Sequence, residues 1–261
     1  MGNSNQAAFF DLDKTLLPGS SLFLLVRGLY DRDFYQIRDV LRLGWEQFLY
    51  RMLGREVDSG VSVAKEAALK FVEGRSRDEL IEMGREIVEE RIFPRLYDGI
   101  VEAMKHHQDQ GDLTFLVTAS PDGVAKVIAE GLNMTDGIGT KAEVDENGYF
   151  TGELDGDLMH GEEKRKAVQE LAEEYDIDLD HSFAYSDSIS DLPLLESVGH
   201  PQVVNPDSEL KQIAYERGWP RYEFRSTRFL IMLGVPATVA GLGLLGGGFT
   251  LGYWMGKREK D

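Results

Sequence analysis

The segment AAFFDLDKTLLPG, residues 7–19, places four apolar residues directly before two aspartates that stand one residue apart. A short apolar run that ends at polar and turn-forming residues is typical of a buried strand. Two interpretations explain why such a strand ends on two like charges. Either solvated acids cap a turn where the chain leaves the core, or the strand holds a reactive carboxylate at the edge of a sheet.

Other short apolar runs and helical segments alternate along the rest of the chain. We expect buried strands at 113–117, 182–185 and 202–204, and helices at 122–132 and 162–175. This alternation predicts an α/β fold with a Rossmann-like, doubly wound parallel sheet. Ligands of such sheets bind at the carboxyl ends of the strands. The second interpretation of the opening segment therefore places both aspartates at a binding edge.

Residues 20–93 differ, because their apolar residues recur three and four positions apart as in helices. We expect an inserted all-helical domain, either a cap over the strand ends or a packing layer. The core then comprises residues 1–19 and 94–225. Within it, residues 143–154 predict a hairpin that turns at Asn147-Gly148, because Asn-Gly favours a tight two-residue turn.

Composition excludes several classes of function. The chain has 46 Asp and Glu against 28 Lys and Arg, a net charge of −18 over 261 residues. This balance argues against nucleic acid as a partner, because phosphate backbones require clustered basic residues. The absence of cysteine from the sequence excludes disulfides, thiolate metal sites and a cysteine nucleophile.

Residues 229–256 form a run of 28 residues without a formal charge, long enough for a transmembrane helix. Tyr253 and Trp254 near its end suit an interfacial aromatic belt. Basic residues flank both ends, namely Arg217, Arg221, Arg225 and Arg228 before it and Lys257, Arg258 and Lys260 after it. A buried core helix and a glycine-rich tail are the alternatives.

The sequence shows no signal peptide before the first strand. We therefore expect a single-pass protein of the cell membrane whose catalytic domain faces the cytoplasm. Gly243 and Gly247, like Gly248 and Gly252, have the spacing of close helix pairs, which suits a homodimer through this segment.

Six residues at predicted strand and helix ends have side chains suited to one reaction, the hydrolysis of a phosphate ester. They are Asp11, Asp13, Thr118, Lys164, Asp187 and Asp191. Asp11 and Asp187, with Asp191 near them, form an oxygen-rich set of the kind that Mg²⁺ prefers. The cation would shield a phosphate dianion so that Asp11 attacks phosphorus and forms an aspartyl-phosphate.

The other residues suit the remaining steps of that reaction. Asp13 suits proton transfer to the leaving oxygen and from the attacking water. Thr118 and Lys164 suit the equatorial phosphoryl oxygens, where transition-state charge is spread. The competing interpretations are ordinary ones: Asp187 and Asp191 as loop acids and a helix cap, and Lys164 as part of a solvated charged face. Ser120 is interpreted as a turn or helix-capping residue.

These motifs in this order resemble the haloacid dehalogenase superfamily. The segments DLDKTLLPGSS, TAS and YSDSISDLPLLESVGHPQVVNPD, with the long insert, resemble its subfamily IB, which includes phosphoserine phosphatase. The resemblance covers about residues 7–215. It implies the same roles for the six residues, with Asp13 also giving its backbone carbonyl to Mg²⁺ and Asp191 standing behind the direct metal ligands.

The sequence departs from phosphoserine phosphatases at one position. The resemblance places a glutamate that binds the substrate ammonium seven residues after Asp13, where this chain has Ser20. We therefore expect a Mg²⁺-dependent phosphomonoesterase acting on a small or lipid-linked phosphate. Arg51 or Arg55 could hold a second anion, and the apolar run Leu22–Val26 could accept acyl chains. The alternatives are a phosphoserine phosphatase proper, a phosphotransferase, and a non-catalytic module that binds a phosphorylated ligand at the membrane.

Overall fold

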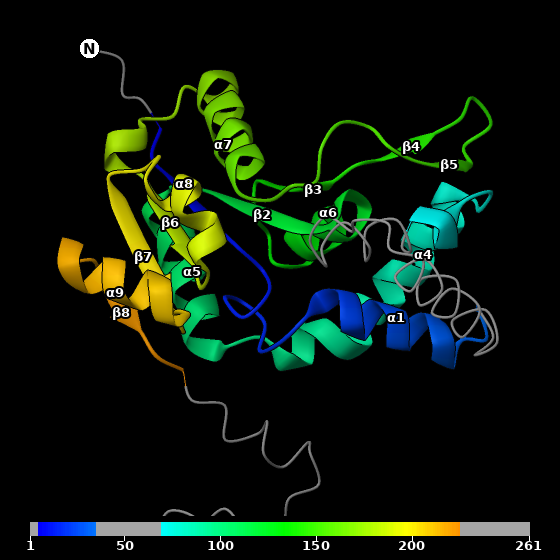
Figure 1. Cartoon of the computed structure of the whole chain (residues 1–261), viewed down its shortest axis with the longest axis horizontal. Coiled ribbons are helices and arrows are strands. Elements are labelled where there is room, and N and C mark those ends of the chain that lie inside the picture. Colours follow the sequence, from blue (N-terminus) through cyan, green and yellow to red (C-terminus); the bar gives the residue numbers. More distant parts are fainter. Residues whose placement is uncertain (1–4, 35–68, 225–261) are drawn as a thin grey trace, which may run out of the picture. The chain divides into compact units, whose positions relative to one another are not determined.

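The computed structural model describes residues 5–34 and 69–224, and a six-stranded parallel sheet lies at its centre (Figure 1). The strand order is β3-β2-β1-β6-β7-β8. The strands are β1 (Ala7–Phe10), β2 (Leu113–Pro121), β3 (Asp136–Thr140), β6 (Phe183–Ser186), β7 (His200–Val204) and β8 (Arg221–Tyr222). The four predicted strands and the α/β class are confirmed, and β3 and β8 are additional.

Strand β3 escaped prediction because two of its five residues are glycines. Helix α6 (Asp122–Gly131) packs directly on it, and a Cβ at Gly137 would lie 2.2 Å from the Ala125 carbonyl oxygen. A Cβ at Gly139 would lie 2.5 Å from the Ser120 carbonyl oxygen. The close approach of helix and strand therefore requires residues that carry no apolar side chain and leave no hydrophobic pattern.

Helices cover both faces of the sheet, as a doubly wound fold requires. Phe9 of β1 stacks on Phe115 of β2 at 5.5 Å, on the face covered by α7 (Glu162–Tyr175), α8 (Leu192–Leu195) and α9 (Ser208–Arg217). Phe10 points to the opposite face, because neighbouring strand residues alternate. There it stacks on Tyr185 at 4.5 Å and meets His107 of α5 (Asp98–Gln110).

The described parts of the insert contain helices, in agreement with the helical periodicity of residues 20–93. They are α1 (Ser21–Asp31), α4 (Arg77–Ile87), the π-helical turn η1 (Val88–Ile92) and the 3₁₀ turn η2 (Phe93–Arg95). Helices α1 and α4 contact each other closely, since a Cβ at Gly28 would lie 2.6 Å from the Ile87 side chain. Residues 35–68, with Arg51 and Arg55, lie outside the described residues.

The predicted hairpin is present as β4 (Ala142–Val144) and β5 (Phe150–Leu154), paired antiparallel. Gly148 takes a φ of 86°, and the Asp145 carboxylate accepts hydrogen bonds from the backbone N–H of Asn147 and of Tyr149. The hairpin is tied to the start of α4 by a bridge between Ser76 and Tyr149. The Asn-Gly signal therefore located the turn. The turn is not the expected two-residue type, because the Asp145 N–H donates to the Tyr149 carbonyl around a three-residue loop and only Gly148, not Asn147, takes a positive φ.

The chain divides into a compact unit, Met1–Glu223, and a second unit, Phe224–Asp261. The uncharged run 229–256, for which a transmembrane helix is expected, lies outside the described residues. Among residues 5–34 and 69–224, none of the helices combines the length and the apolar character that a bilayer crossing needs.

Candidate active site

Strands β1, β2 and β6 end at one edge of the sheet, where the chain order changes direction. The chain runs from β1 to β2 and β3 on one side, and β6 and β7 then occupy the other side. Binding sites of doubly wound sheets lie at this switch point. Asp11 follows β1 directly, and its backbone N–H donates to the Tyr185 carbonyl at 3.0 Å. The sheet ladder thus holds the Asp11 backbone at that edge.

Lys164 joins two buried carboxylates at this edge. Its Nζ donates to Asp11 Oδ1 at 2.6 Å and to Asp191 Oδ2 at 2.7 Å. All three residues are at most 5% exposed. Lys164 lies in the first turn of α7, where a cation opposes the helix dipole. Helix stability therefore does not explain why a lysine stands at this position. Its hydrogen bonds to Asp11 and Asp191 explain it.

In this cluster, burial and the neighbouring charges have opposite effects on the pKa values of Asp11 and Lys164. Burial raises the pKa of Asp11 to about 6, although the Lys164 charge acts to lower it and the Asp191 charge adds to the rise. Burial acts to lower the pKa of Lys164, but the charges of Asp11 and Asp191 outweigh burial and raise it. Lys164 therefore keeps its charge, and Asp11 holds its proton to a higher pH than an ordinary carboxyl does.

Asp187 directly follows β6. Unlike Asp11 and Asp191, its carboxylate is not hydrogen-bonded to Lys164. Burial, together with the charge of Asp11, raises its pKa to about 7. The exposed Lys14 places its Nζ 3.8 Å from Asp187 Oδ2. Two buried carboxylates that repel each other at a sheet edge form a donor set suited to a divalent cation.

The residues present therefore fit Mg²⁺. Mg²⁺ needs only one or two protein carboxylates and keeps waters or phosphate oxygens as its other ligands. In the described part of the chain, no group of three His, Cys, Asp or Glu side chains is arranged as a ready metal cage. A set built from Asp11, Asp187 and a backbone carbonyl contains only two such side chains, so the two observations agree.

Asp13 lies next to the amino end of helix α1. Its Oδ1 accepts a hydrogen bond of 2.8 Å from the backbone N–H of Ser21. Ser20 caps α1, because its side chain accepts from the Phe23 N–H. The residue that replaces the expected glutamate is therefore the N-cap of the first insert helix, and only Leu25 of the run Leu22–Val26 is buried.

Thr118 lies in β2 beside the end of β1 and is 1% exposed. The β2–β3 register shifts between Val117 and Pro121, so Thr118 stands where the regular ladder breaks. Its Oγ1 accepts from the Ser120 N–H at 3.2 Å. A threonine hydroxyl that accepts one hydrogen bond still has its own hydrogen to donate.

The interpretation of Ser120 as a helix cap is wrong. Pro121 occupies the N-cap position of α6, and that cap makes no side-chain hydrogen bond. The Ser120 hydroxyl instead lies 2.6 Å from the Ser21 hydroxyl. Pattern analysis missed this role because the two serines are 99 residues apart and meet only when the insert packs on β2.

The predicted site residues thus fall into one directly bonded group and three neighbours. Asp11, Lys164 and Asp191 are hydrogen-bonded to one another, while Asp187, Asp13 and Thr118 surround them at the ends of β6, β1 and β2. Asp191 occupies the N-cap position of α8 without a capping hydrogen bond. Its Oδ2 instead accepts from Lys164 and from the Ser186 hydroxyl, so Asp191 orients the lysine.

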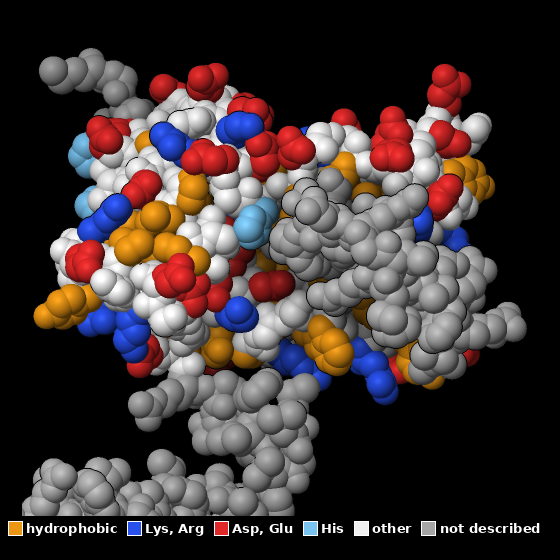
Figure 2. Space-filling model, viewed as in Figure 1, with side chains coloured by type: hydrophobic (Ala, Val, Ile, Leu, Met, Phe, Trp, Pro, Cys, Tyr) orange, Lys and Arg blue, Asp and Glu red, His pale blue; other side chains and the backbone are white. Residues whose placement is uncertain are grey.

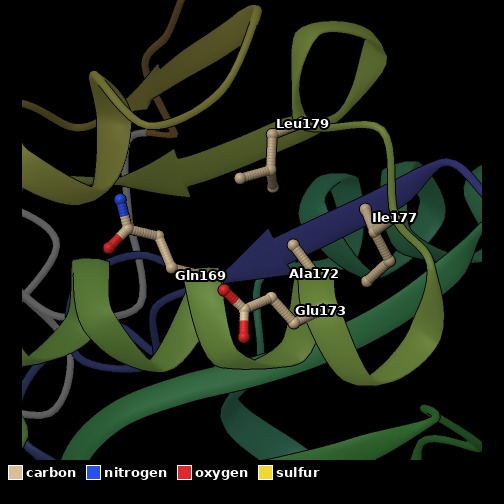
Figure 3. Close-up of a pocket in the computed structure, with 5 residues that line it drawn as sticks. All are labelled: Gln169, Ala172, Glu173, Ile177 and Leu179. Carbon is tan, nitrogen blue, oxygen red and sulfur yellow. The ribbon is translucent and has the colours of Figure 1, made fainter.

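A separate shallow pocket lies away from this cluster (Figure 3). Its lining residues are Gln169, Ala172, Glu173, Ile177 and Leu179. Ile177 pairs with Asn5, just before β1, so this pocket lies at the amino ends of the strands. Lys164 and Asp11 lie at the opposite, carboxyl edge. The pocket therefore does not belong to the candidate active site.

Acidic side chains gather on the surface of α7 and of the β4–β5 hairpin (Figure 2). The exposed ones include Glu170, Glu173, Glu174, Glu143, Asp145 and Glu146. Such a surface repels long phosphate polymers. In the part of the chain that the structure describes, Lys164 and Lys14 bring positive charge to the candidate site, where they can hold a single phosphate group.

The fold and the cluster agree with a family comparison. Residues 8–196 match the model of the haloacid dehalogenase-like hydrolases, and the chain belongs to this family. It is a phosphatase of the haloacid dehalogenase type, similar to phosphoserine phosphatases, that hydrolyses phosphomonoesters. Phosphatases of this family are typically Mg²⁺-dependent.

Several individual proteins are similar to the chain. Phosphoserine phosphatase SerB1 of Mycobacterium tuberculosis is 42% identical over 92% of this chain and 78% of its own length. The histidinol-phosphatase of Neisseria meningitidis is 31% identical over 84% of this chain and 98% of its own length. The crystal structure of a protein of unknown function from Bordetella pertussis superposes with a TM-score of 0.72 at 30% identity, over 84% of this chain and 99% of that one.

Proposed function

We propose that the chain hydrolyses phosphomonoesters through an aspartyl-phosphate on Asp11. The observation that carries the proposal is the buried Asp11 carboxylate, held by Lys164 at the switch-point edge of the sheet. Because Lys164 engages Oδ1, we assign the attack on phosphorus to Oδ2. A fixed carboxylate beside a buried cation is a nucleophile whose geometry is set before the substrate binds.

The remaining residues act in two successive displacements. Asp11 forms a bond to phosphorus while the bond to the alcohol oxygen breaks, and Asp13 gives that oxygen a proton. Asp13 then takes a proton from the water whose oxygen bonds to phosphorus, the bond between phosphorus and Asp11 breaks, and inorganic phosphate leaves. Thr118 donates its hydroxyl hydrogen and Lys164 its positive charge to the equatorial oxygens.

The Asp11 and Asp187 carboxylates and the Asp13 backbone carbonyl would hold Mg²⁺. When bound, Mg²⁺ supplies positive charge that offsets the acids and polarises the phosphoryl oxygens. Asp191 stays behind these ligands, because its Oδ2 is already bonded to Lys164 and Ser186.

Two classes of substrate have support from different observations. The 42% identity to a protein named phosphoserine phosphatase favours phosphoserine. Against it, Ser20 is a neutral helix cap where a substrate ammonium would need a carboxylate. The uncharged run 229–256 favours a substrate in the membrane, because a site tied to a bilayer meets lipid phosphates at high effective concentration.

We therefore infer a membrane-anchored phosphatase with its active site on the cytoplasmic side, acting on a small or lipid-linked phosphate. The support is the length of the uncharged run, its flanking basic residues and its interfacial aromatic residues. Glycine pairs such as Gly243 and Gly247 suit self-association of this segment as a homodimer.

The first prediction concerns Asp11→Asn. We expect phosphate release from 4-nitrophenyl phosphate with Mg²⁺, and a loss of about 10³-fold or more in kcat for the variant, because the amide cannot form the intermediate. Asp180→Asn, an exposed acid away from the edge, is the matched control and should keep full turnover. An Asp11→Asn enzyme as active as the control would contradict the proposal.

A substrate panel then separates the alternatives. Phosphoserine, lysophosphatidate and phosphatidylglycerophosphate are compared by kcat/KM, with and without added alcohols as phosphoryl acceptors. Preference for either lipid supports a membrane-anchored phosphatase of lipid-linked phosphates. Preference for phosphoserine supports a phosphoserine phosphatase. Transfer to an alcohol in place of water identifies a phosphotransferase. Binding of phosphate esters without turnover identifies a non-catalytic module.

A further inference from the structure

A chain of three hydrogen bonds links the amino end of helix α1 to two of the proposed catalytic residues. The Ser21 N–H donates to Asp13 Oδ1 at 2.8 Å, and the Ser21 and Ser120 hydroxyls lie 2.6 Å apart. The Ser120 N–H donates to Thr118 Oγ1 at 3.2 Å. We propose that Ser21 is a positioning residue, which orients Asp13 for proton transfer and couples α1 to Thr118; this inference rests on the proposed function.

Burial makes this chain of hydrogen bonds effective. Ser21 is fully buried, Thr118 is 1% exposed and Ser120 is 6% exposed. Water therefore does not compete for the Ser21–Ser120 and Ser120–Thr118 hydrogen bonds, whereas the bond from Ser21 to Asp13 is part-buried. Helix α1 belongs to the insert and Thr118 to the sheet. A displacement of α1 would therefore change the positions of the Asp13 and Thr118 side chains together.

The bond to Asp13 also distinguishes its two oxygens. Ser21 holds Oδ1, which leaves Oδ2 as the atom that exchanges a proton with substrate. A general acid works only when its oxygen lies within hydrogen-bond reach of the leaving group. Loss of the Ser21 N–H releases the carboxylate to rotate, and proton donation suffers while the nucleophile stays in place.

The two contacts of Ser21 can be distinguished by comparing two variants. Ser21 is the first residue of α1, a position at which proline is well tolerated. Ser20 has φ −105° and ψ 123°, the extended conformation that the residue before a proline prefers. Ser21→Pro therefore removes both the N–H bond to Asp13 and the hydroxyl. Ser21→Ala removes only the hydroxyl and keeps the N–H.

The readout is the dependence of kcat/KM on the leaving group. An alkyl phosphate such as glycerol 2-phosphate needs proton donation to its leaving oxygen, whereas 4-nitrophenyl phosphate hardly does. For Ser21→Pro we expect kcat/KM on the alkyl ester to fall at least tenfold more than on the aryl ester. This is part of the ~10²–10⁴-fold that general acid–base catalysis supplies. Merely structural damage lowers both values alike.

Ser76→Ala is the control for general damage to a helix of the insert, because the Ser76 side chain caps α4 by accepting from the Glu79 N–H and contacts none of the proposed catalytic residues. It should lower the melting temperature and leave the ratio of the two kcat/KM values unchanged. Asp13→Asn tests the proposed function separately, since it must itself lose alkyl phosphate turnover. If Asp13→Asn is inactive on the alkyl ester and Ser21→Pro keeps the wild-type ratio, the positioning role alone is overturned.

A second measurement tests whether the Ser21–Ser120 hydrogen bond couples α1 to Thr118. It does not depend on the proline variant. Ser21→Ala and Ser120→Ala break the same hydroxyl–hydroxyl bond. We expect each to lower kcat/KM about fivefold on both esters, and the double variant to lose no more than either single one. Losses that multiply in the double variant would show that the two serines act independently and would overturn the coupling.

Discussion

Lys164 is the residue that makes the buried acids of this site compatible with a folded core. Its ammonium bonds to both Asp11 and Asp191, with all three groups almost fully buried. Burying a charge is strongly unfavourable unless a partner compensates it. Lys164 therefore has a structural role in addition to its proposed role at the phosphoryl group.

Replacing this lysine should destabilise the protein severely. For Lys164→Met we expect the free energy of unfolding at pH 8 to fall by about 3–5 kcal/mol, because two buried carboxylates lose their cation. The loss should be smaller at pH 5.5, where Asp11 takes up a proton. Lys166→Met removes an exposed pair with Glu163 and should change stability by less than about 1 kcal/mol in urea unfolding.

The raised pKa values of Asp11 and Asp187 predict the pH dependence of stability without metal. Both values, about 6 and about 7, lie above the usual 3.8, so the folded state binds protons more tightly than the unfolded state. The free energy of unfolding should therefore fall as pH rises from 5 to 8. Thermal melts of chelator-treated protein measure this slope.

Bound Mg²⁺ should reduce the loss of stability that occurs as the pH rises. A cation competes with protons for the same carboxylates, so added Mg²⁺ should raise the melting temperature more at pH 8 than at pH 5.5. Asp187→Asn removes one of the two titrating acids and should flatten the metal-free slope. A wild-type slope in this variant would show that Asp187 does not contribute to it.

At the scale of elements, the contact of α6 with β3 depends on glycine. A Cβ at Gly137 would lie 2.2 Å from the Ala125 carbonyl oxygen, and backbone cannot move aside as a flexible side chain does. We expect Gly137→Ala to lower the free energy of unfolding by about 1–3 kcal/mol or more. A guanidinium titration measures this loss.

Gly84 of α4 is the matched control for that substitution. A Cβ there would lie 3.5 Å from the Val124 side chain, an ordinary contact. Gly84→Ala should therefore stabilise the protein by up to about 1 kcal/mol through helix propensity. If both variants changed stability by the same amount and sign, close packing would not be the reason for glycine in β3.

At the scale of the whole molecule, the run 229–256 predicts association of the full chain with lipid bilayers. Two charges at its centre, Leu244→Arg with Leu245→Arg, should abolish co-flotation with liposomes, because each costs roughly 3 kcal/mol in a bilayer. Gln212→Arg with Tyr215→Arg adds the same charge to the exposed surface of α9 and should leave flotation unchanged. Flotation of both variants alike would argue against a membrane segment.

Much of the fold and most of the candidate site follow from local sequence patterns. The apolar runs before Asp11 and Asp187 are buried strands, and the helical periodicity of 162–175 matches α7 residue for residue. Asn147-Gly148 marks the hairpin turn. These features are local, because a few consecutive residues determine whether a strand, helix or turn can bury its apolar side.

Local patterns do not predict which side chains those elements bring together. The two glycines of β3 carry no hydrophobic signal, yet they let α6 close on the sheet. The Lys164 bridge between Asp11 and Asp191, and the serine pair Ser21–Ser120, join residues 27 to 153 positions apart. Local patterns are enough to predict the reactive residue types and the strand ends that carry them. Which groups bond to which depended on packing between distant segments, because side-chain contacts form only when whole elements meet.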